Sequence, residues 1–285
     1  MAVIVGILLV LVMSFGGFIL AGGKFGIILH ALPFEMMIIG GSAVGAFVSG
    51  NTGVVLKKTL KDFSKIFKGA KWKRNDYQDV LALWFEIAKF IRTKGLLGLE
   101  SHLENPKESE IFKKYPKILG DHFAVDFICD TLRLMTMNRD DPNQVEDSME
   151  KLLEKHHHEA TTPADSMQSM ADALPALGIV AAVLGVIKTM ASITEPPEIL
   201  GAMIGGALVG TFLGVFLAYG IVGPMASRLK QTYEEEAQFY YIIRDAIVAH
   251  LHGHAPQVSV EIGRGNVPSH LQPSFQDLEA ALSTI

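Results

Sequence analysis

Four long apolar runs constrain this chain more than any other feature of its sequence. They extend over Met1 to Gly23, Met36 to Leu56, Ala173 to Ile193 and Ile199 to Ser227, and Lys188 is the only charged residue within them. About 20 predominantly apolar residues suffice for a helix to cross a bilayer, so each run is long enough. The mean hydropathy of +0.30 over 285 residues is also high for a soluble protein. The sequence therefore predicts an all-α, polytopic membrane protein with four transmembrane helices.

The first run is interpreted as a retained transmembrane helix rather than as a cleaved signal peptide. No basic residue precedes its apolar core, and the core is longer than that of a usual signal peptide. A convincing cleavage site of small residues is also missing. We therefore count this run among the four spans.

Basic residues are concentrated directly after the second run. That segment carries Lys57, Lys58, Lys61, Lys65, Lys68, Lys71, Lys73 and Arg74. By contrast, the loop from Gly22 to Glu35 contains Lys24 as its single lysine or arginine. Because loops rich in Lys and Arg stay in the cytoplasm, both termini and the long middle region are expected there. A lysine-rich stretch beside a span is typical of a topology and lipid-headgroup signal, and no segment indicates nucleic-acid binding.

Helical periodicity dominates the rest of the chain. Apolar positions recur at helical spacing from Asp76 to Lys94, and Gly95 is expected to end that helix. Further helices are predicted over 121–137, over 142–158 with Asp141 as the N-cap, and over 274–282, whereas VSVEIG (258–263) is expected to be extended. The predicted domains are a transmembrane hairpin at 1–56, a cytoplasmic helical domain at 57–170, a second transmembrane hairpin at 171–227, and a cytoplasmic C-terminal helix and tail at 228–285.

Sequence motifs for enzymatic chemistry are missing. No glycine-rich stretch has the G-x-x-x-x-G-K-[ST] order of a phosphate-binding loop, and no G-x-S-x-G nucleophile elbow occurs. Histidines cluster at His156, His157 and His158, and again at His250, His252 and His254. Three consecutive side chains point around a helix, and alternating ones align only in an extended segment, so a solvated surface is favoured over a metal site. The sequence favours a non-enzyme without cofactor or metal, and the single cysteine, Cys129, is expected to be a core thiol.

The third and fourth runs form a hairpin that is the candidate functional region. The fourth run carries Gly201, Gly205, Gly206, Gly210 and Gly214, spaced as small-xxx-small pairs. Such glycines let helices approach closely, and ordinary packing accounts for them when they are taken alone. They are combined, however, with the hydroxyl of Thr211, with a stripe of small residues on the third run that includes Ala182, and with Pro175 and Pro224 near the charged flanks. This combination favours the walls of an ion path.

None of the four runs contains a carboxylate. An ion-conducting membrane protein usually needs an ionisable group in its core. Lys188 lies near the outer end of its run and is expected to extend outward to the membrane surface. If this chain guides protons, a partner must supply the carboxylate.

Several longer motifs follow one another along the chain. They are GLLGLESHLENPKESEIFKKYP (95–116), DALPALGIVAAVLGVI (172–187), VGTFLGVFLAYGIVGP (209–224), HAPQVSVEIGRG (254–265) and QPSF (272–275). Together they resemble the MotA family of bacterial flagellar stator subunits, within the MotA/TolQ/ExbB proton channel proteins, over nearly the whole chain. The resemblance implies a component of bacterial motility and chemotaxis in the inner membrane.

The resemblance also implies partners and site residues. Such subunits form a ring, a pentamer, around a dimer of a MotB-type partner whose transmembrane helix brings an aspartate. The cytoplasmic bundle would touch the rotor protein FliG, with Arg92 and Glu100 as the contacting charges. Pro175 and Pro224 match prolines that couple ion flow to movement, and Thr211 matches a hydroxyl residue near the ion site.

The coupling ion is inferred from the same resemblance. Sodium-driven relatives carry a threonine at the position of Ala182, where an extra oxygen can replace part of the hydration of sodium. Alanine at this position favours protons as the coupling ion, with sodium as the alternative.

Two other functions are weighed against a motor. One is an energy transducer of the ExbB or TolQ class that powers an outer-membrane process, but those relatives lack the two-hairpin arrangement and the LESHLENPKESEIF stretch. The other is a passive membrane scaffold without ion flow. Replacing Pro175 or the partner's aspartate would leave a scaffold working and would stop a motor.

Overall fold

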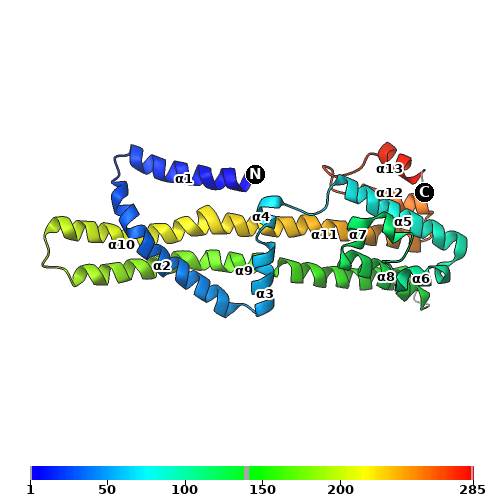
Figure 1. Cartoon of the computed structure of the whole chain (residues 1–285), viewed down its shortest axis with the longest axis horizontal. Helices are drawn as coiled ribbons and strands as arrows, with labels where there is room; N and C mark the ends of the chain where they lie inside the picture. The colour runs from blue at the N-terminus through cyan, green and yellow to red at the C-terminus, as the bar shows by residue number, and fades with distance from the viewer. Residues whose placement is uncertain (1, 138–140, 284) are drawn as a thin grey trace. The chain divides into compact units, whose positions relative to one another are not determined.

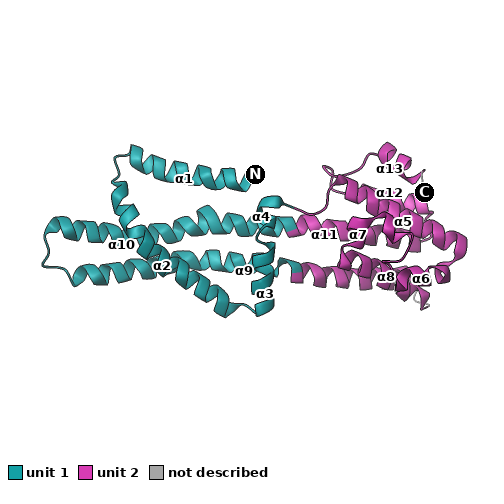
Figure 2. Ribbon diagram, in the orientation of Figure 1, with its two compact units in different colours: residues 1–69, 160–232 teal, residues 70–159, 233–285 magenta. Residues whose placement is uncertain are grey.

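The computed structural model describes residues 2–137, 141–283 and 285, and Met1, the first residue of the first predicted span, lies outside them. Within these ranges every regular element is a helix, as the sequence predicts (Figure 1). The chain divides into two compact units (Figure 2). Unit 1 comprises residues 1–69 and 160–232, and unit 2 comprises residues 70–159 and 233–285. The two units are defined by which residues pack together. The four-part division expected from the sequence is defined by membrane topology and stays a prediction.

Unit 1 holds the helices that are long and apolar enough to cross a membrane. Its elements are α1 (Ala2–Leu20), α2 (Phe25–Gly50), α3 (Gly53–Asp62), α4 (Lys65–Lys68), the second part of α9 (Pro142–Met190), α10 (Pro197–Leu217), the π-helical turn η3 (Ala218–Val222) and the start of α11 (Gly223–Leu251). Four candidate spans lie in α1, in α2, in α9 and in the stretch that α10 begins. The four predicted transmembrane helices are therefore present.

The second span begins earlier than the sequence analysis expected. We placed residues 22–35 in a loop, but α2 starts at Phe25 and includes Pro33 and Glu35. His30, Pro33 and Glu35 lower the hydropathy of this segment, which hides the span from an apolar-run search. A helix nevertheless forms because a backbone inside a bilayer must satisfy its own hydrogen bonds. The second span therefore contains a carboxylate, which corrects the expectation that none of the spans does.

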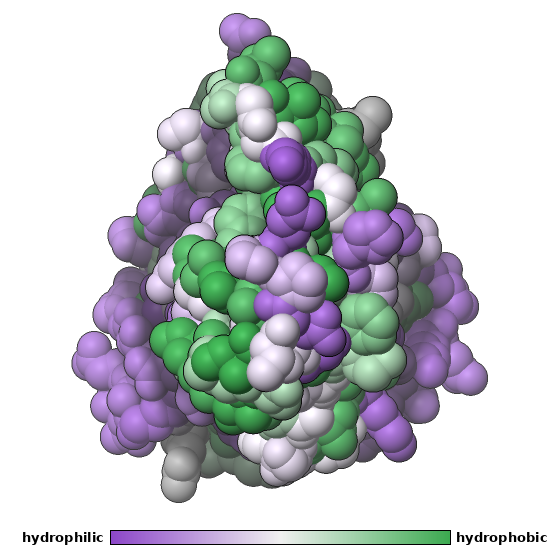
Figure 3. All heavy atoms as spheres, turned by 90° about the vertical axis from the view of Figure 1, so that its left-hand side faces the viewer, coloured by the Kyte–Doolittle hydropathy of each residue, from purple (hydrophilic) through white to green (hydrophobic). Residues whose placement is uncertain are grey.

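Apolar side chains cover much of the outside of unit 1. No residue of α1 is buried, and large side chains such as Leu8, Val12 and Met13 are exposed. Figure 3 shows green apolar patches on the face in view, interleaved with polar side chains. Exposed apolar surface on this scale is suited to lipid or to a neighbouring chain.

Unit 2 is a helical bundle with a single well-packed core. Its elements are α5 (Arg74–Lys94), η1 (Leu96–Leu99), α6 (Glu100–Glu104), η2 (Phe112–Lys114), α7 (Pro116–Leu119), α8 (His122–Thr136), α12 (Pro256–Gly265), α13 (Phe275–Leu282) and the adjoining parts of α9 and α11. The apolar stripe of α5 is buried, as its helical spacing predicts, and Gly95 caps the helix at a positive φ of 77°. Trp72 stacks on Phe239 of α11 with ring centroids 3.7 Å apart.

Side-chain caps fix the helix starts that the sequence predicted. The Asp121 carboxylate accepts a hydrogen bond from the amide of Ala124 at 2.8 Å, which starts α8. The Asp141 carboxylate accepts one from the amide of Asn143 at 3.1 Å, which starts α9, and Ser274 caps α13 in the same way. Each cap satisfies an amide that has no partner in the first turn of a helix.

The tail segment VSVEIG is helical, not extended as predicted. It lies within α12, which Pro256 begins, and Ser259, Val260 and Gly263 form the buried face of that helix. A Cβ atom on Gly263 would lie 2.9 Å from Cδ2 of Leu81, so α12 packs closely on α5. Tertiary packing at helical spacing outweighs the strand preference of the valines and the isoleucine.

Candidate ion-path site

Glycines bring the backbones of α9 and α10 into direct contact. A Cβ atom on Gly214 would lie 2.6 Å from the carbonyl oxygen of Leu174, and one on Gly178 would lie 2.8 Å from the carbonyl oxygen of Gly210. Farther along the pair, a Cβ atom on Gly185 would lie 2.6 Å from Cβ of Ala207. Real Cβ atoms do not come this close to backbone atoms, so the helix pair requires small residues at these positions.

Other glycines of α10 face α2 or open space. A Cβ atom on Gly205 would lie 3.3 Å from Cγ2 of Ile27, and one on Gly206 would lie 3.9 Å from Cβ of Ala31. Gly201 has nothing within 4 Å. The five glycines that the sequence analysis grouped as one packing motif therefore have three different surroundings.

Gly210 is the point where α2, α9 and α10 meet. A Cβ atom there would lie 2.7 Å from Oε2 of Glu35 on α2, 3.1 Å from Cβ of Ala181 and 3.1 Å from the backbone nitrogen of Ala182 on α9. Thr211 follows Gly210 directly and is half-buried, as is Ala182. The structure thus brings the two predicted wall residues to one region and adds a carboxylate that the sequence analysis missed.

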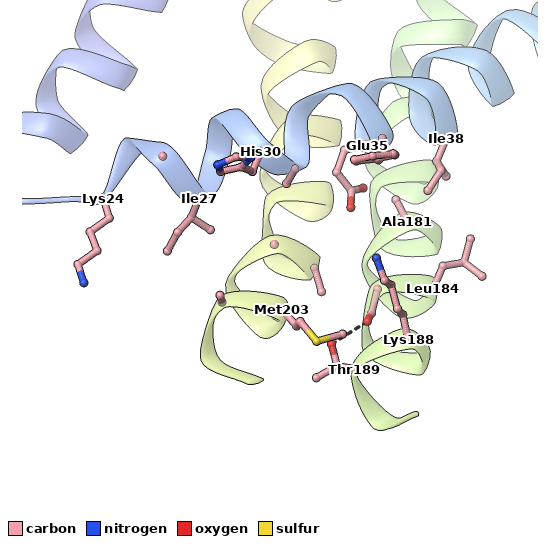
Figure 4. A pocket seen from close by; sticks show the side chains of 17 residues that line it. Lys24, Ile27, His30, Glu35, Ile38, Ala181, Leu184, Lys188, Thr189 and Met203 are labelled. Atoms are coloured by element: carbon pink, nitrogen blue, oxygen red, sulfur yellow. Dashed lines mark hydrogen bonds between the residues drawn. The ribbon is translucent and has the colours of Figure 1, made fainter. Parts of the chain in front are cut away.

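Glu35 is 7% exposed and points from α2 into the space between α9 and α10 (Figure 4). A pocket of about 780 Å³ opens beside it. Its ionisable lining residues are Lys24, His30, Glu35 and Lys188, while α10 contributes small and apolar ones, Ala202, Met203, Gly206 and Ala207. The hydroxyl of Thr189 lies at the far end and donates to the carbonyl of Gly185 at 2.9 Å.

Lys188 shares this pocket with Glu35, where the sequence analysis expected it to extend outward. Figure 4 shows its side chain running along α9 toward the end of the pocket that Glu35 occupies. Long side chains on a helix lean toward the N-terminus, which for Lys188 is the direction of Ala181. The charged lining of the pocket therefore includes one acidic and one basic group from different helices.

Pro175 and Pro224 lie inside continuous helical segments. Pro175 is half-buried in α9, and Pro224 is exposed at the start of α11, directly after η3. Proline has no amide to donate and clashes with the carbonyl four residues earlier, and a π-helical turn relieves both problems by widening the helix. The π-helical turn at Ala218–Val222 therefore accommodates Pro224, whereas Pro175 lies within an α-helix.

Arg92 and Glu100 are both exposed in unit 2. Arg92 lies in the last turn of α5 and Glu100 begins α6, with η1 between them. Neither side chain has an ion pair within the described part of the chain. Leu97, in η1, is 76% exposed beside them. These charges are free to meet another molecule.

Two side-chain hydrogen bonds connect different parts of unit 2. The indole of Trp84 donates to the hydroxyl of Ser259 at 3.2 Å, and the hydroxyl of Tyr240 donates to the Asp121 carboxylate at 3.1 Å. Burial, followed by the charge of Asp121, raises the pKa of Tyr240.

Burial raises the pKa of Cys129 to about 12, so the thiol is protonated and inert at neutral pH. Within the described residues no group of three or more His, Cys, Asp or Glu side chains could hold a metal ion.

Sequence comparisons agree along the chain. Residues 4–95 match the family model for the motility protein A N-terminal region, and residues 121–241 match that of the MotA/TolQ/ExbB proton channel family. The chain is 41% identical to motility protein A of Salmonella typhimurium and 40% identical to that of Escherichia coli, in both cases over 98% of this chain and 94% of the relative. The chain belongs to the motility protein A (MotA) family. As a MotA-family protein it is a stator subunit of the bacterial flagellar motor and carries a proton channel family domain.

Solved structures agree with the MotA fold. The structure of C. jejuni MotAB superposes with a TM-score of 0.72 at 23% identity, covering 94% of this chain and 96% of that one. The flagellar MotAB stator complex from Bacillus subtilis superposes with a TM-score of 0.68 at 24% identity, covering 90% and 92%. At these identities the likeness establishes the fold alone.

Glu35 is a buried carboxylate beside the pocket that sequence reasoning missed. A signal for it was present, because residues 25–50 carry Glu35 as their single Asp, Glu, Lys or Arg. Treating that whole stretch as one span would have placed a carboxylate inside the membrane. Placing an ionisable carboxylate inside a bilayer costs free energy, so its presence there indicates a functional role.

Proposed function

We propose that this stator subunit couples inward proton flow to torque, together with a MotB-type partner that brings a transmembrane aspartate. The observation that supports the proposal is the close approach of α2, α9 and α10 at Gly210. A Cβ atom there would lie close to Glu35 Oε2 and to the backbone nitrogen of Ala182, and Thr211 is the next residue of α10. Two solved structures of the same fold are described as MotAB assemblies, which supports such a partner. The partner's carboxylate would bind a proton from outside, lose its charge near Ala182 and Thr211, and release the proton to the cytoplasm.

The assembly is proposed as a pentameric ring around a partner dimer. The exposed apolar surface of α1 and the close helix contacts in unit 1 suit an assembly whose spans move as rigid bodies. One elementary charge crossing the membrane makes available about 2.3 kcal/mol per 100 mV, which suffices for a ring step but not for unfolding a helix bundle. Pro175 and Pro224 would couple ion flow to that movement.

The subunit is proposed to lie in the bacterial inner membrane with both termini in the cytoplasm. The lysine-rich segment after α2 supports this orientation through the positive-inside rule. Unit 2 would then meet the rotor protein FliG through the exposed charges Arg92 and Glu100.

Collapsing the proton gradient and the sodium gradient separately, while single cells are tracked, tests the coupling ion. We expect swimming speed to follow the proton gradient because Ala182 offers no side-chain oxygen to replace the hydration of sodium. Speed that follows the sodium gradient would overturn the assignment of protons as the coupling ion.

Replacing the partner's aspartate with asparagine is expected to stop rotation, and unchanged rotation would instead favour a passive scaffold.

A further inference from the structure

The segment that directly follows the second span is a basic helix. Phe63 and Ser64, which separate α3 from α4, also have right-handed helical backbone angles, so residues 53–68 form almost one continuous helix. Its lysines are Lys57, Lys58, Lys61, Lys65 and Lys68. Asp62 is its single acidic residue, and that side chain is buried. The exposed surface of this helix is therefore strongly positive.

An exposed apolar stripe runs along the same helix. The buried side consists of Thr59, Asp62 and Ile66. Outside it, Leu60 is 80% exposed, Phe63 is 43% exposed and Phe67 is 38% exposed. Their spacing of three and then four residues places them on one face of a helix, and the two phenylalanine rings lie 5.9 Å apart. This stripe has no place in the core of unit 1.

Three exposed lysines form a second stripe beside the apolar one. Lys57, Lys61 and Lys68 are spaced by four and then seven residues, so they lie on one helix face. None of them has an ion pair or a side-chain hydrogen bond within the described residues. Like charges four residues apart destabilise a helix, so this arrangement adds nothing to folding. Such a face is complementary to a negatively charged surface.

The connection to α2 and α9 sets the depth of this helix. α2 ends at Gly50, and the hydroxyl of Ser166 on α9 donates a hydrogen bond to the side-chain oxygen of Asn51 at 2.7 Å. Ser166 precedes the apolar run that starts at Ala173 by seven residues, about 10 Å along a helix. The headgroup layer on each side of a bilayer is about 5 to 8 Å thick, so α3 begins at the level of the headgroups. Figure 1 shows α3 running across the direction of α9 rather than along it.

We propose that residues 53–68 form an interfacial helix that binds anionic phospholipids of the membrane that the spans cross. The apolar stripe enters the boundary between headgroups and acyl chains, and the three lysines contact lipid phosphates. Helices with aromatic residues on one side and lysines on another bind in this plane. Lysine stems also pack on apolar groups while the ammonium reaches the headgroups. This inference is independent of the proposed proton path, because it requires only that α2 crosses the membrane.

Phe67→Trp places a fluorescent reporter in the apolar stripe. The full chain is reconstituted in nanodiscs of equal amounts of phosphatidylglycerol and phosphatidylcholine, with bromine on the acyl chains of one lipid at a time. Bromine quenches tryptophan fluorescence on contact, so the ratio of the two quenching constants reports which lipid lies at the helix. The chain with Phe67 intact supplies the background from Trp72 and Trp84, its two tryptophans.

We expect quenching to favour phosphatidylglycerol by about fivefold, the equivalent of about 1 kcal/mol, which is the contribution of one lysine at an anionic membrane surface. High salt should reduce this preference by screening. Glutamine at all three positions, Lys57, Lys61 and Lys68, is expected to remove most of it, whereas arginine there should retain it. The matched control replaces three exposed lysines of unit 2 with glutamine and should leave the ratio unchanged; they are Lys94, Lys107 and Lys155.

Three results would overturn the proposal. One is an equal lipid preference in the glutamine variant and in the chain that retains the three lysines. Another is the absence of any preference for phosphatidylglycerol in that chain, or a preference that high salt does not reduce, which decides the question even if the glutamine variant fails to fold. The third is a reporter at Phe67→Trp that neither brominated lipid quenches, because a protein surface rather than lipid would then cover the stripe.

Discussion

The absence of a Cβ atom at single glycine residues allows α9 and α10 to pack closely. Gly214 has backbone atoms of Leu174 and Gly178 within 2.8 Å of the position where a Cβ atom would stand. Backbone atoms cannot rotate away as a flexible side chain can, so the two helices would have to separate. Gly201 stands in open space on the same helix. The two glycines therefore form a matched pair for a test.

Gly214→Ala is expected to destabilise the protein by about 1 to 3 kcal/mol, the usual cost of forcing extra atoms into a packed contact. The measurement is thermal unfolding of the purified full chain in lipid. Gly201→Ala is the control and is expected to leave the midpoint unchanged or to raise it slightly, because alanine favours helices. Equal midpoints for both variants would contradict the close contact between α9 and α10.

His250 provides a pH-dependent term in the stability of unit 2. Its ring lies edge-on to Trp84 with centroids 5.7 Å apart, and its Nδ1 atom is buried without a partner among the described residues. Burial lowers the pKa of His250 below its ordinary value of 6.5, and the backbone of His254 opposes part of this shift. The unfolded chain therefore binds a proton more readily than the folded one.

The folded state should lose stability as the pH falls from 6.5 through the lowered pKa of His250, because protonation then favours the unfolded chain. The unfolding midpoint of the full chain is measured between acidic and neutral pH. His250→Gln is expected to flatten this dependence, whereas a change at exposed His252, His252→Gln, should leave it in place. Parallel profiles for His250→Gln and the unchanged protein would assign the dependence to other groups.

At the scale of elements, the π-helical turn η3 links α10 to α11. Pro224 follows it and cannot donate an amide to the carbonyl of Gly220, so a regular α-helix through this point would leave an acceptor unpaired. Proline at Pro197 has no such effect, because the first residue of a helix has no intrahelical partner for its amide. The same residue type thus follows a π-helical turn within one continuous helical segment and begins another helix.

Pro224→Ala is expected to let η3 relax toward a regular α-helix and to lower torque per stator unit, while the number of units in the motor stays normal. The reason is that the restored amide removes the local cause of the π-helical turn. Torque is read from speed steps of tethered cells, with Pro197→Ala as the control. A variant that rotates normally would show that the turn has no part in coupling.

At the scale of the whole molecule, function depends on surfaces that a single chain leaves open. Arg92 and Glu100 are exposed near the turn η1, and the spans present apolar faces without a protein partner in one copy. Exposed charges contribute little to folding, so their value lies in what they meet. The proposed ring and rotor contact would occupy both kinds of surface.

Arg92→Glu is expected to reduce swimming, because it reverses a charge proposed to face FliG. A complementary charge reversal on FliG should restore motility, as measured by the expansion of colonies in soft agar. The control is Lys107→Glu, an exposed charge elsewhere in the same unit, which the FliG change should not rescue. Failure of every FliG reversal to rescue Arg92→Glu would count against direct contact.

The sequence by itself determined that there are four spans, that the remaining elements are largely helical, and which family the chain belongs to, because apolar length, helical spacing and helix caps are local properties. Helix starts at Asp121, Asp141 and Ser274 followed from the same local chemistry. Tertiary structure alone decided that the segment 258–263 is helical and that Glu35 packs against Gly210. Both depend on contacts distant in sequence, Gly263 with Leu81 and Glu35 with Gly210, and such contacts outweigh local preference once a packed interface forms.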